Sequence, residues 1–365
     1  MWAVTTRVDE ATDPVLFARL VNWQRQHGRH GLPWQGTRDP YRVWLSEIML
    51  QQTQVGTVLD YYPRFLVRFP DVQTLARAEA DDVLALWSGL GYYSRARNLH
   101  RCAQQVVQQW GGAFPRTSAE LATLSGIGRS TAAAVAAFCF GEPVSILDGN
   151  VRRVLTRVLA YDGDLSSSRH EQQLWALAQG LLPDQPTPDE MGSYTQGLMD
   201  LGATVCTRAR PQCAACPWGD TCAAHAQGRE TAYPVKTRKL VRRTEAWWWL
   251  VLRRPDGACW LQQRPTPGIW AGLHSFPVFD GEAELQSALT GLGGALLEVR
   301  GVVRHVLTHR DLVLTPVVAQ VPHDAAIAHL GPGRWVHPAE VVAGTVGVGL
   351  PTPVRDLLED LAGQP

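Results

Sequence analysis

The hydrophobic pattern of the chain changes near residue 240, and this change constrains the fold more than any other feature. The first 230 residues are predicted to be mostly helical, because Asp13-Pro14 and Asp39-Pro40 each place an N-cap residue before a proline at the first helical position. From Glu245 onward, short apolar runs broken by Gly and Pro predict strands: AWWWLVLRR, ACWLQQR and DLVLTPVVAQV. A chain of 365 residues also exceeds the roughly 250 to 300 residues at which single cores stop growing. We therefore predict two domains, a mainly helical one over 1–230 and one of mixed α and β structure over 244–365, joined by a basic segment over 231–243.

Composition narrows the class of protein but not its partner. Hydrophobic residues make up 45% and charged residues 19% of the chain, which is typical of a soluble globular protein. The N-terminal sequence lacks the features of a secretory signal, and the apolar runs fall far short of the roughly 20 residues that cross a bilayer. We expect a cytosolic protein with no membrane partner. The formal net charge of zero gives no bulk electrostatic support for nucleic-acid binding, and the local basic run VKTRKLVRR fits either a solvated linker or a DNA contact.

Glu47 is the first candidate for chemistry. Helical spacing in DPYRVWLSEIMLQQTQ, residues 39–54, puts this carboxylate on the same face as Val43, Trp44, Leu50 and Gln51. Desolvation favours the neutral form of a carboxyl group and raises its pKa, as a general acid near neutral pH requires. The alternative is that Glu47 lies at the edge of the apolar stripe and makes an ordinary hydrogen bond.

A glycine-containing turn follows in LSGIGRSTAAAVAAFCFG, residues 124–141. Thr117 and Glu120 form a capping-box pattern for a short preceding helix, and Gly126 and Gly128 then lead into an alanine-rich helix. Because glycines have no side chains, the backbone N–H groups there can approach a phosphate at the positive end of the second helix. The alternative is a plain packing corner between two helices.

Asp148 follows an apolar run in SILDGNVRRVLTRVL, residues 145–159, and is placed at the start of a helix. Backbone donors and the helix dipole at that position favour the ionised carboxylate, although a purely structural N-cap has the same signature. Paired with Glu47, the two environments are expected to shift the two pKa values in opposite directions. That pattern is typical of an acid and an anion that share one reaction.

Four of the seven cysteines lie in CTRARPQCAACPWGDTC, at Cys206, Cys213, Cys216 and Cys222. A chain of this size does not need a disulfide scaffold, and clustered cysteines in a cytosolic protein more often bind metal. Only one gap is as short as the C-x2-4-C pairs of zinc sites, and four thiolates without histidine also suit a [4Fe-4S] cluster. The spacing alone leaves zinc and iron–sulfur open.

Together these motifs resemble the MutY-type adenine DNA glycosylases of the helix-hairpin-helix superfamily. The motifs that carry the resemblance, in the family's order, are WLSEIMLQQTQV, GLGYYSRARNLH, LSGIGRSTAAAV, ILDGNVRRVLTR, MDLGATVCTRARPQCAACP and RPTPGIWAGLHSFP. The resemblance implies a helical glycosylase domain with its hairpin at about 117–141, a [4Fe-4S] loop over 206–222, and a Nudix-like C-terminal domain. Under this reading the four cysteines hold the cluster, which closes a loop that presents Arg208 and Arg210 to DNA phosphate.

The resemblance also implies the reaction and its residues. Glu47 matches the family's catalytic acid, Asp148 its essential aspartate, and Asn150 a residue that helps to position them. The implied reaction is base excision repair of double-stranded DNA, in which adenine paired with 8-oxoguanine or with G is removed by hydrolysis to leave an abasic site. Ser130 stands where bifunctional relatives have a lysine nucleophile, so we expect a monofunctional enzyme. The alternatives are an endonuclease III-like glycosylase/lyase that acts on oxidised pyrimidines, an iron–sulfur redox protein and a non-catalytic DNA-binding protein.

DNA contacts in the first domain carry over individually from the resemblance. Leu32 and Trp34 match residues that wall the adenine pocket, while Gln52 and Tyr92 match residues that intrude into the duplex around the lesion pair. We expect a monomer that is associated with the nucleoid.

The C-terminal region is expected to recognise 8-oxoguanine without hydrolysing nucleotides, because no run of acidic metal ligands like the Nudix box follows GLHSFPVFDG. The family's Phe-Ser-His contact to 8-oxoguanine corresponds to Leu307, Thr308 and His309. The aromatic residue is absent, whereas Thr308 and His309 keep hydroxyl and imidazole donors.

Overall fold

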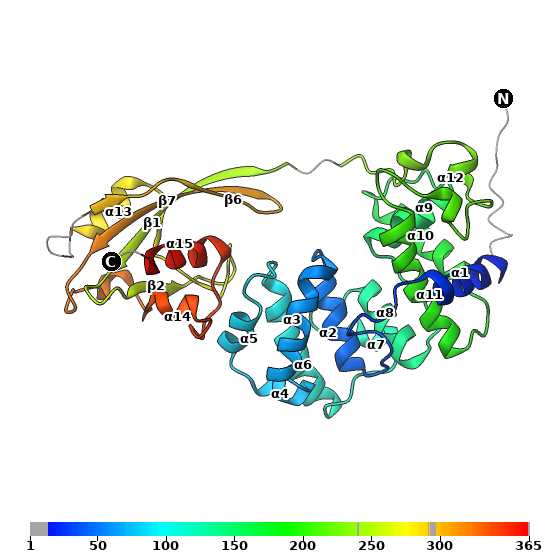
Figure 1. Cartoon of the computed structure of the whole chain (residues 1–365), viewed down its shortest axis with the longest axis horizontal. Helices are drawn as coiled ribbons and strands as arrows, with labels where there is room; N and C mark the ends of the chain where they lie inside the picture. Colours follow the sequence, from blue (N-terminus) through cyan, green and yellow to red (C-terminus); the bar gives the residue numbers. More distant parts are fainter. Residues whose placement is uncertain (1–13, 239–240, 291, 293–296, 364–365) are drawn as a thin grey trace. The chain divides into compact units, whose positions relative to one another are not determined.

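The structure is a computed structural model that describes residues 14–238, 241–290, 292 and 297–363 (Figure 1). By its internal contacts the chain divides into two compact units. Residues up to 73 and 101–239 form the first unit, and residues 74–100 and 240–365 form the second. None of the described helices is long and apolar enough to cross a membrane.

The part of the chain before residue 240 is helical, as the sequence predicts. Its α-helices are α1 (Pro14–His27), α2 (Pro40–Leu50), α3 (Val55–Arg68), α4 (Val72–Arg77), α5 (Ala80–Leu86), α6 (Ser94–Trp110), α7 (Ser118–Leu121), α8 (Arg129–Phe140), α9 (Gly149–Val158), α10 (Ser168–Gly180), α11 (Pro188–Asp200) and α12 (Ala223–Ala226). The described residues before 239 also include three short segments: the π-helical η2 (Leu201–Val205) and the 3-10 helices η3 (Cys213–Ala215) and η4 (Glu230–Ala232).

Local sequence signals account for several helix starts. The Asp39 carboxylate caps α2 by accepting a hydrogen bond from the Tyr41 N–H at 2.9 Å, so this predicted start is confirmed. Thr117 caps α7 by accepting from the Glu120 N–H, which confirms the Thr117 half of the predicted capping box. The Glu120 carboxylate accepts from the Thr117 hydroxyl at 2.7 Å. The other Asp-Pro signal is at Asp13, which lies outside the described residues, and α1 begins at Pro14.

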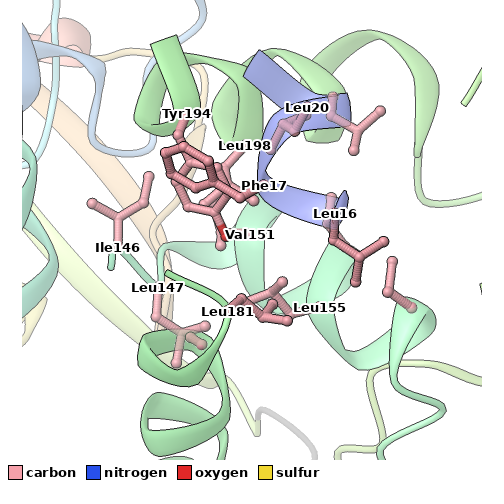
Figure 2. Close-up of a cluster of buried hydrophobic side chains, with 14 of the residues drawn as sticks. Leu16, Phe17, Leu20, Ile146, Leu147, Val151, Leu155, Leu181, Tyr194 and Leu198 are labelled. Atoms are coloured by element: carbon pink, nitrogen blue, oxygen red, sulfur yellow. The ribbon is translucent and has the colours of Figure 1, made fainter. Parts of the chain in front are cut away.

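The core of the first unit gathers residues from α1, α8, α9, α10 and α11 (Figure 2). Leu147 and Val151, which flank Asp148 in the sequence, are both buried in this cluster. Phe17 of α1 stacks on Tyr194 of α11, with the ring centroids 4.7 Å apart. The same apolar packing that stabilises the unit therefore holds the backbone on both sides of Asp148.

The described residues of the second unit form an eight-stranded mixed sheet. Its strands are β1 (Arg243–Arg253), β2 (Cys259–Gln263), β3 (His274–Ser275), β4 (Val278–Phe279), β5 (Leu297–Val299), β6 (Val303–Val306), β7 (Arg310–Gln320) and β8 (Arg334–Val336). The long strands β1 and β7 pair in parallel along their full length, and β6 returns antiparallel on β7 to form a hairpin. The helical segments of this region are α13 (Glu282–Leu289), η5 (Ala328–Leu330), α14 (Pro338–Val342) and α15 (Thr352–Ala362). The strands expected from the three apolar runs are thus present as β1, β2 and β7.

Alternation along β1 separates two apolar layers. Leu250 and Leu252 face a core that includes Leu285 of α13. Trp249 contacts Trp270 and Phe276 instead, at centroid distances of 6.1 and 5.5 Å. A strand buried on both faces reads as an almost continuous apolar run, which explains the sequence AWWWLVL.

Residues 74–100 contact the C-terminal part of the chain within the second unit. The hydroxyl groups of Ser88 and Tyr93 donate to the carbonyl oxygen of Leu350 at 3.0 and 2.9 Å. The Arg97 guanidinium donates to the carbonyl oxygen of Ala271 at 2.6 Å. The loop that carries Tyr92 therefore belongs to the same unit as the predicted 8-oxoguanine-reading residues.

Truncation of Trp218 is expected to destabilise the first unit strongly. Its side chain is fully buried, and its indole N–H donates to the Leu16 carbonyl oxygen at 2.9 Å, so it fastens the cysteine loop to α1. Trp218→Ala should destabilise the fold by about 3–5 kcal/mol, seen as a lower thermal midpoint. Trp110→Ala, at a position that is 36% exposed, is the matched control and should change the midpoint little. Equal shifts for the two variants would contradict the assignment.

Candidate active site

An open cleft of about 1450 Å³ lies in the first unit. It brings together residues that are far apart in the sequence, including seven of the predicted site residues: Leu32, Trp34, Glu47, Gln52, Ser130, Asp148 and Asn150. The cleft is also lined by Arg29, Gln35, Gln196 and Met199, which the sequence analysis did not single out. Concave sites with a few convergent polar groups are the usual places of ligand binding.

Glu47 lies on α2 with only part of its surface facing the cleft. Its neighbours on the helix, Val43, Trp44 and Ile48, are buried in the core. Burial raises the pKa of Glu47 to about 8, and the nearby Asp148 carboxylate contributes to this rise. Glu47 therefore holds a proton at neutral pH, as the predicted acid must.

Asp148 is the N-cap of α9, where its Oδ1 atom accepts from the Val151 N–H at 2.7 Å. That bond, a second from the Asn150 N–H and the charges of Arg153 and Arg152 all lower its pKa. Burial nevertheless outweighs them and raises the pKa of Asp148 above its ordinary value.

The expectation that the two carboxyl groups shift in opposite directions is therefore wrong. Both pKa values rise, because burial disfavours the charged form of each carboxyl group. The groups still differ in their partners, since backbone donors and arginines stabilise the anionic form of Asp148, whereas burial and a neighbouring carboxylate both favour the neutral form of Glu47. These partners therefore favour the anionic form of Asp148 more than that of Glu47.

Ser130 supports the backbone next to Asp148. Its Oγ atom accepts a hydrogen bond from the Leu147 N–H at 3.1 Å. The carbonyl oxygen of Leu147 accepts from the Arg152 Nε atom at 3.2 Å, so both backbone polar atoms of Leu147 are held. Asp148 is thus fixed from the residue that precedes it as well as by its own cap.

Asn150 is oriented by Arg153, one turn further along α9. The Arg153 Nη2 atom donates to the Asn150 Oδ1 atom at 3.0 Å and to the Gly202 carbonyl oxygen at 2.7 Å. Gly202 packs so closely that an added Cβ atom would lie 2.7 Å from the Asn150 Cβ atom, so only glycine fits there. With its oxygen engaged by Arg153, the Asn150 side chain is held in one orientation at the edge of the cleft.

The wall of the cleft comes from the turn between α1 and α2. Trp34 is 8% exposed and meets Tyr62 edge to face at 5.5 Å. The Gln35 side chain spans this turn by donating to the Arg29 carbonyl oxygen at 3.0 Å and accepting from the Leu32 N–H at 3.1 Å. These bonds hold Leu32 and Trp34 as one wall.

Gln52 and Tyr92 share an unusual backbone conformation. Both are non-glycine residues with a positive φ, 57° for Gln52 and 47° for Tyr92. Such conformations are sparsely populated and concentrate at functional sites. Gln52 lines the cleft, whereas Tyr92 is 45% exposed in the second unit.

The predicted hairpin of two helices is formed by α7 and α8. Gly126 has a φ of 77° in the turn, and Gly128 is the N-cap of α8 without a side chain to close it. An added Cβ atom on Gly128 would meet nothing within 4 Å, so its surroundings are open. The N-terminal amides of α8 are therefore accessible to an anion.

The four cysteines converge around a small cavity between α9 and the cysteine loop. Burial raises the pKa of the Cys216 thiol to about 12, and the neighbouring sulfur atoms of Cys206, Cys222 and Cys213 act in the same direction. Thiols gathered in this way ionise together only beside a strong positive charge, so the set fits a metal group.

Other polar side chains lie beside the four cysteines. The buried Arg157 donates from Nη1 to the Cys206 Sγ atom at 3.4 Å. Among the described residues, the compact ligand set within 4.8 Å is Cys213 with His225 and Glu230, rather than the four sulfur atoms.

The predicted reading residues form the turn of the β6–β7 hairpin in the second unit. The Leu307 N–H donates to the Arg310 carbonyl oxygen at 2.7 Å and closes the turn, which leaves Thr308 and His309 exposed. The Thr308 hydroxyl donates to the Tyr92 hydroxyl oxygen at 3.3 Å. Thr308 and Tyr92, which are 216 positions apart in the sequence, thus lie side by side.

Two families of known proteins match this chain. Residues 45–179 match the HhH-GPD superfamily of base excision DNA repair proteins, and residues 248–360 match the NUDIX domain. An adenine DNA glycosylase of Buchnera aphidicola is 34% identical over 351 residues, covering 95% of this chain and 97% of the relative. The human adenine DNA glycosylase is 34% identical, and the match covers 91% of this chain and 72% of the human protein.

The chain belongs to the adenine DNA glycosylase family. The resemblance inferred from the sequence motifs is thereby confirmed, as is the fold class of a helical glycosylase domain followed by a Nudix-like domain. Among solved structures, a thermostable thymine-DNA glycosylase is 27% identical with a TM-score of 0.51, covering 58% of this chain and 96% of that one.

The sequence analysis did not predict four residues in or directly behind the cleft: Arg29, Arg153, Gln196 and Asp200. Arg153 stands three residues after Asn150, so helical spacing could have paired them. Asp200 lies six residues before the cysteine motif in an ordinary apolar pattern, and no local signal marks its burial or its partner Arg29.

The buried acid should make the stability of this glycosylase depend on pH. Between the ordinary value of 4.5 and about 8, folded Glu47 keeps a proton that the unfolded chain releases, so stability falls as pH rises through this window. Glu47→Gln removes this cost, so its stability relative to wild type should grow with pH, by at most about 1.4 kcal/mol per pH unit. Thermal midpoints between pH 5.5 and 8.5 measure the difference.

The exposed Glu359 supplies the control, since Glu359→Gln should show no such trend. A Glu47→Gln advantage that stays constant across the pH range would show that Glu47 is not a buried, protonated group.

Proposed function

We propose that this chain is a monofunctional adenine DNA glycosylase of base excision repair. It removes adenine mispaired with 8-oxoguanine or with G from double-stranded DNA, hydrolyses the N-glycosidic bond and leaves an abasic site. Residues 1–230 carry base excision, the basic segment 231–243 links the domains, and residues 244–365 recognise 8-oxoguanine. The enzyme acts as a monomer on DNA in the bacterial cytosol.

The observation that carries this proposal is that two carboxyl groups with different partners, Glu47 and Asp148, line a single cleft. Glu47 has a pKa raised to about 8 by burial, and Asp148 is held by backbone donors at the start of α9. Adenine is a poor leaving group until it is protonated, and the sugar becomes cationic as the base departs. The two carboxyl groups supply what those two changes need.

The proposed mechanism begins when the adenosine is flipped out of the stack into the cleft, against the wall of Leu32 and Trp34. Neutral Glu47 gives its proton to adenine N7, and the bond between N9 and the sugar C1′ breaks with its electron pair going to the base. Asp148 stabilises the oxocarbenium-like sugar by charge or through a transient covalent bond. A water molecule that loses a proton to the Glu47 carboxylate then adds to C1′.

Ser130 supports hydrolysis over strand cleavage. Its hydroxyl accepts from the Leu147 N–H, and a serine cannot form the Schiff base through which a lysine cuts the strand. An endonuclease III-like lyase that acts on oxidised pyrimidines, the competing reading, needs that lysine.

The four cysteines are proposed to hold a [4Fe-4S] cluster. Bound there, the cluster supplies positive metal charge to four thiolates and closes the loop over 206–222. The exposed side chains of Arg208 and Arg210 then point to solvent, where DNA phosphate can reach them.

A duplex cleavage assay tests the proposal directly. Wild-type protein should release adenine from A:8-oxoG and A:G duplexes but not from A:T, with strand breaks appearing only after alkali. Glu47→Gln should lose about a thousandfold in single-turnover rate, because one proton-transfer group is typically worth about 10²–10⁴. Asp148→Asn should lose a comparable amount while still binding the duplex.

Three results would contradict the proposal. Excision that survives Glu47→Gln would show that Glu47 is not the catalytic acid. Strand breaks without alkali would indicate a lyase. Trapping of a stoichiometric protein–DNA adduct by borohydride would show that a lysine acts as nucleophile.

His309 should contribute to discrimination between 8-oxoG:A and G:A. Its exposed imidazole lies beside Thr308 at the tip of the β6–β7 hairpin. A hydrogen-bond donor on this imidazole can distinguish 8-oxoguanine from guanine. His309→Ala should lower the ratio of excision rates for 8-oxoG:A over G:A by about tenfold, the worth of one lost hydrogen bond. His323→Ala, exposed in the same unit but away from the hairpin, is the control. An unchanged ratio would exclude His309 from recognition.

A further inference from the structure

A histidine and a glutamate lie beside the four cysteines and have no role in the proposed function. His225 belongs to the short helix α12, and Glu230 begins the 3-10 helix η4. Their ligand atoms and the Cys213 sulfur all lie within 4.8 Å of one another, and these three residues are the compact group of candidate metal ligands among the described residues. The position of Cys213 therefore has two further candidate ligands next to it.

Glu230 orients the ring of His225. The His225 Nδ1 atom lies 2.6 Å from the Glu230 Oε1 atom. A carboxylate only accepts hydrogen bonds, so Nδ1 donates, and the other ring nitrogen of the neutral imidazole keeps its lone pair. Histidines that bind metal are usually held in this way, with a carboxylate on the nitrogen that does not bind the metal.

His225 and Glu230 line the cavity around which the four cysteines converge. Cys213, Cys216 and His225 also line an open hollow of about 870 Å³ beside α1. Thiolates that solvent reaches are the ones most susceptible to oxidation. Cys213 therefore combines access from solvent with a neighbouring group that can replace its sulfur.

The charge of Glu230 favours an imidazole over a thiolate at this position. The Glu230 Oε1 atom lies 3.6 Å from the Cys213 Sγ atom. A metal-bound thiolate at Cys213 places a second negative charge beside the carboxylate, which is unfavourable, whereas the N–H group of a neutral imidazole is stabilised by the same carboxylate. Imidazole is also a suitable ligand for cluster iron, since two histidines replace two cysteines on one iron of Rieske centres.

We propose that His225, held by Glu230, is a reserve ligand for the cluster iron that Cys213 binds. When the Cys213 sulfur is lost as a ligand, the neutral imidazole donates a nitrogen lone pair to the same iron. One dative bond replaces another, and no electron is transferred. This inference rests on the proposed [4Fe-4S] cluster and adds a fifth residue that can bind it.

Cys213→Ala tests the inference because it removes the sulfur and leaves His225 in place. Protein purified without oxygen should keep about four irons per chain in Cys213→Ala, as an intact [4Fe-4S] cluster requires. Cys213→Ala/His225→Ala should keep about three. After oxidation, this double variant should show the electron paramagnetic resonance signal of a [3Fe-4S] cluster, which Cys213→Ala should lack.

His27→Ala supplies the matched control. His27 is an exposed histidine of α1 that lines the same hollow but is not in the compact ligand group. Cys213→Ala/His27→Ala should therefore keep about four irons. Cys216 is also outside that group, so the iron content of Cys216→Ala should be the same with and without His225.

Isotope labelling identifies the ligand directly. When the histidines carry labelled nitrogen, the reduced cluster of Cys213→Ala should show a hyperfine coupling to that nitrogen, and Cys213→Ala/His225→Ala should not. Glu230→Ala removes the group that orients the ring. Cys213→Ala/Glu230→Ala should therefore lose its fourth iron to a chelator about tenfold faster than Cys213→Ala.

The outcomes separate the roles that His225 can have. About four irons in Cys213→Ala/His225→Ala, or about three in Cys213→Ala, would overturn the inference. If Cys213→Ala does not fold, oxidation of wild type and of His225→Ala by ferricyanide decides. His225→Ala should then form the [3Fe-4S] signal about tenfold faster, and equal rates would overturn the inference. Wild-type protein that contains no iron would instead refute the proposed cluster.

Discussion

Helix α9 is the element on which both candidate sites depend. Its first turn carries Asp148 as N-cap, and its later turns carry Arg153 and Arg157, which reach the cysteine loop. Arg153 binds Asn150 at one end and the Cys206 carbonyl oxygen, at 2.8 Å, at the other. A helix of this length is stiff, so the position of the cysteine loop and the position of Asp148 are set together.

Burial of that helix also explains the electrostatics of the cleft. Val151 and Leu147 anchor Asp148 in the core, which takes the carboxyl group out of water and raises its pKa (Figure 2). The backbone donors at the helix start limit that rise, whereas burial and the Asp148 charge both push the pKa of Glu47 upward. The difference between Glu47 and Asp148 therefore comes from the partners available to two buried groups, and not from one group being buried and the other solvated.

Sequence reasoning succeeded where a local pattern has one physical outcome. Asp39 before a proline determines the start of α2, and a carboxylate in an apolar stripe or at a helix start marks Glu47 and Asp148 as candidates. The direction of the Asp148 shift was predicted wrongly, since the balance between cap and burial depends on packing from α8, α10 and α11. Asp200 was missed altogether because its partner Arg29 lies 171 positions away, and such pairs follow from topology, which no periodicity encodes.

The Arg157 guanidinium on α9 orients the backbone of the cysteine loop. The Arg157 guanidinium donates to the carbonyl oxygens of Thr207 and Arg208 at 2.7 and 2.9 Å, so the backbone of the loop turns inward. The side chain of Arg208 then has the solvent side available, and it is exposed. A cluster held by the four cysteines would close this loop from the inside while α9 carries Asp148 at its other end. The single helix α9 would then fix the position of a phosphate bound at the loop relative to a sugar bound in the cleft. A fixed position of the substrate relative to the reacting groups lowers the entropic part of a reaction barrier.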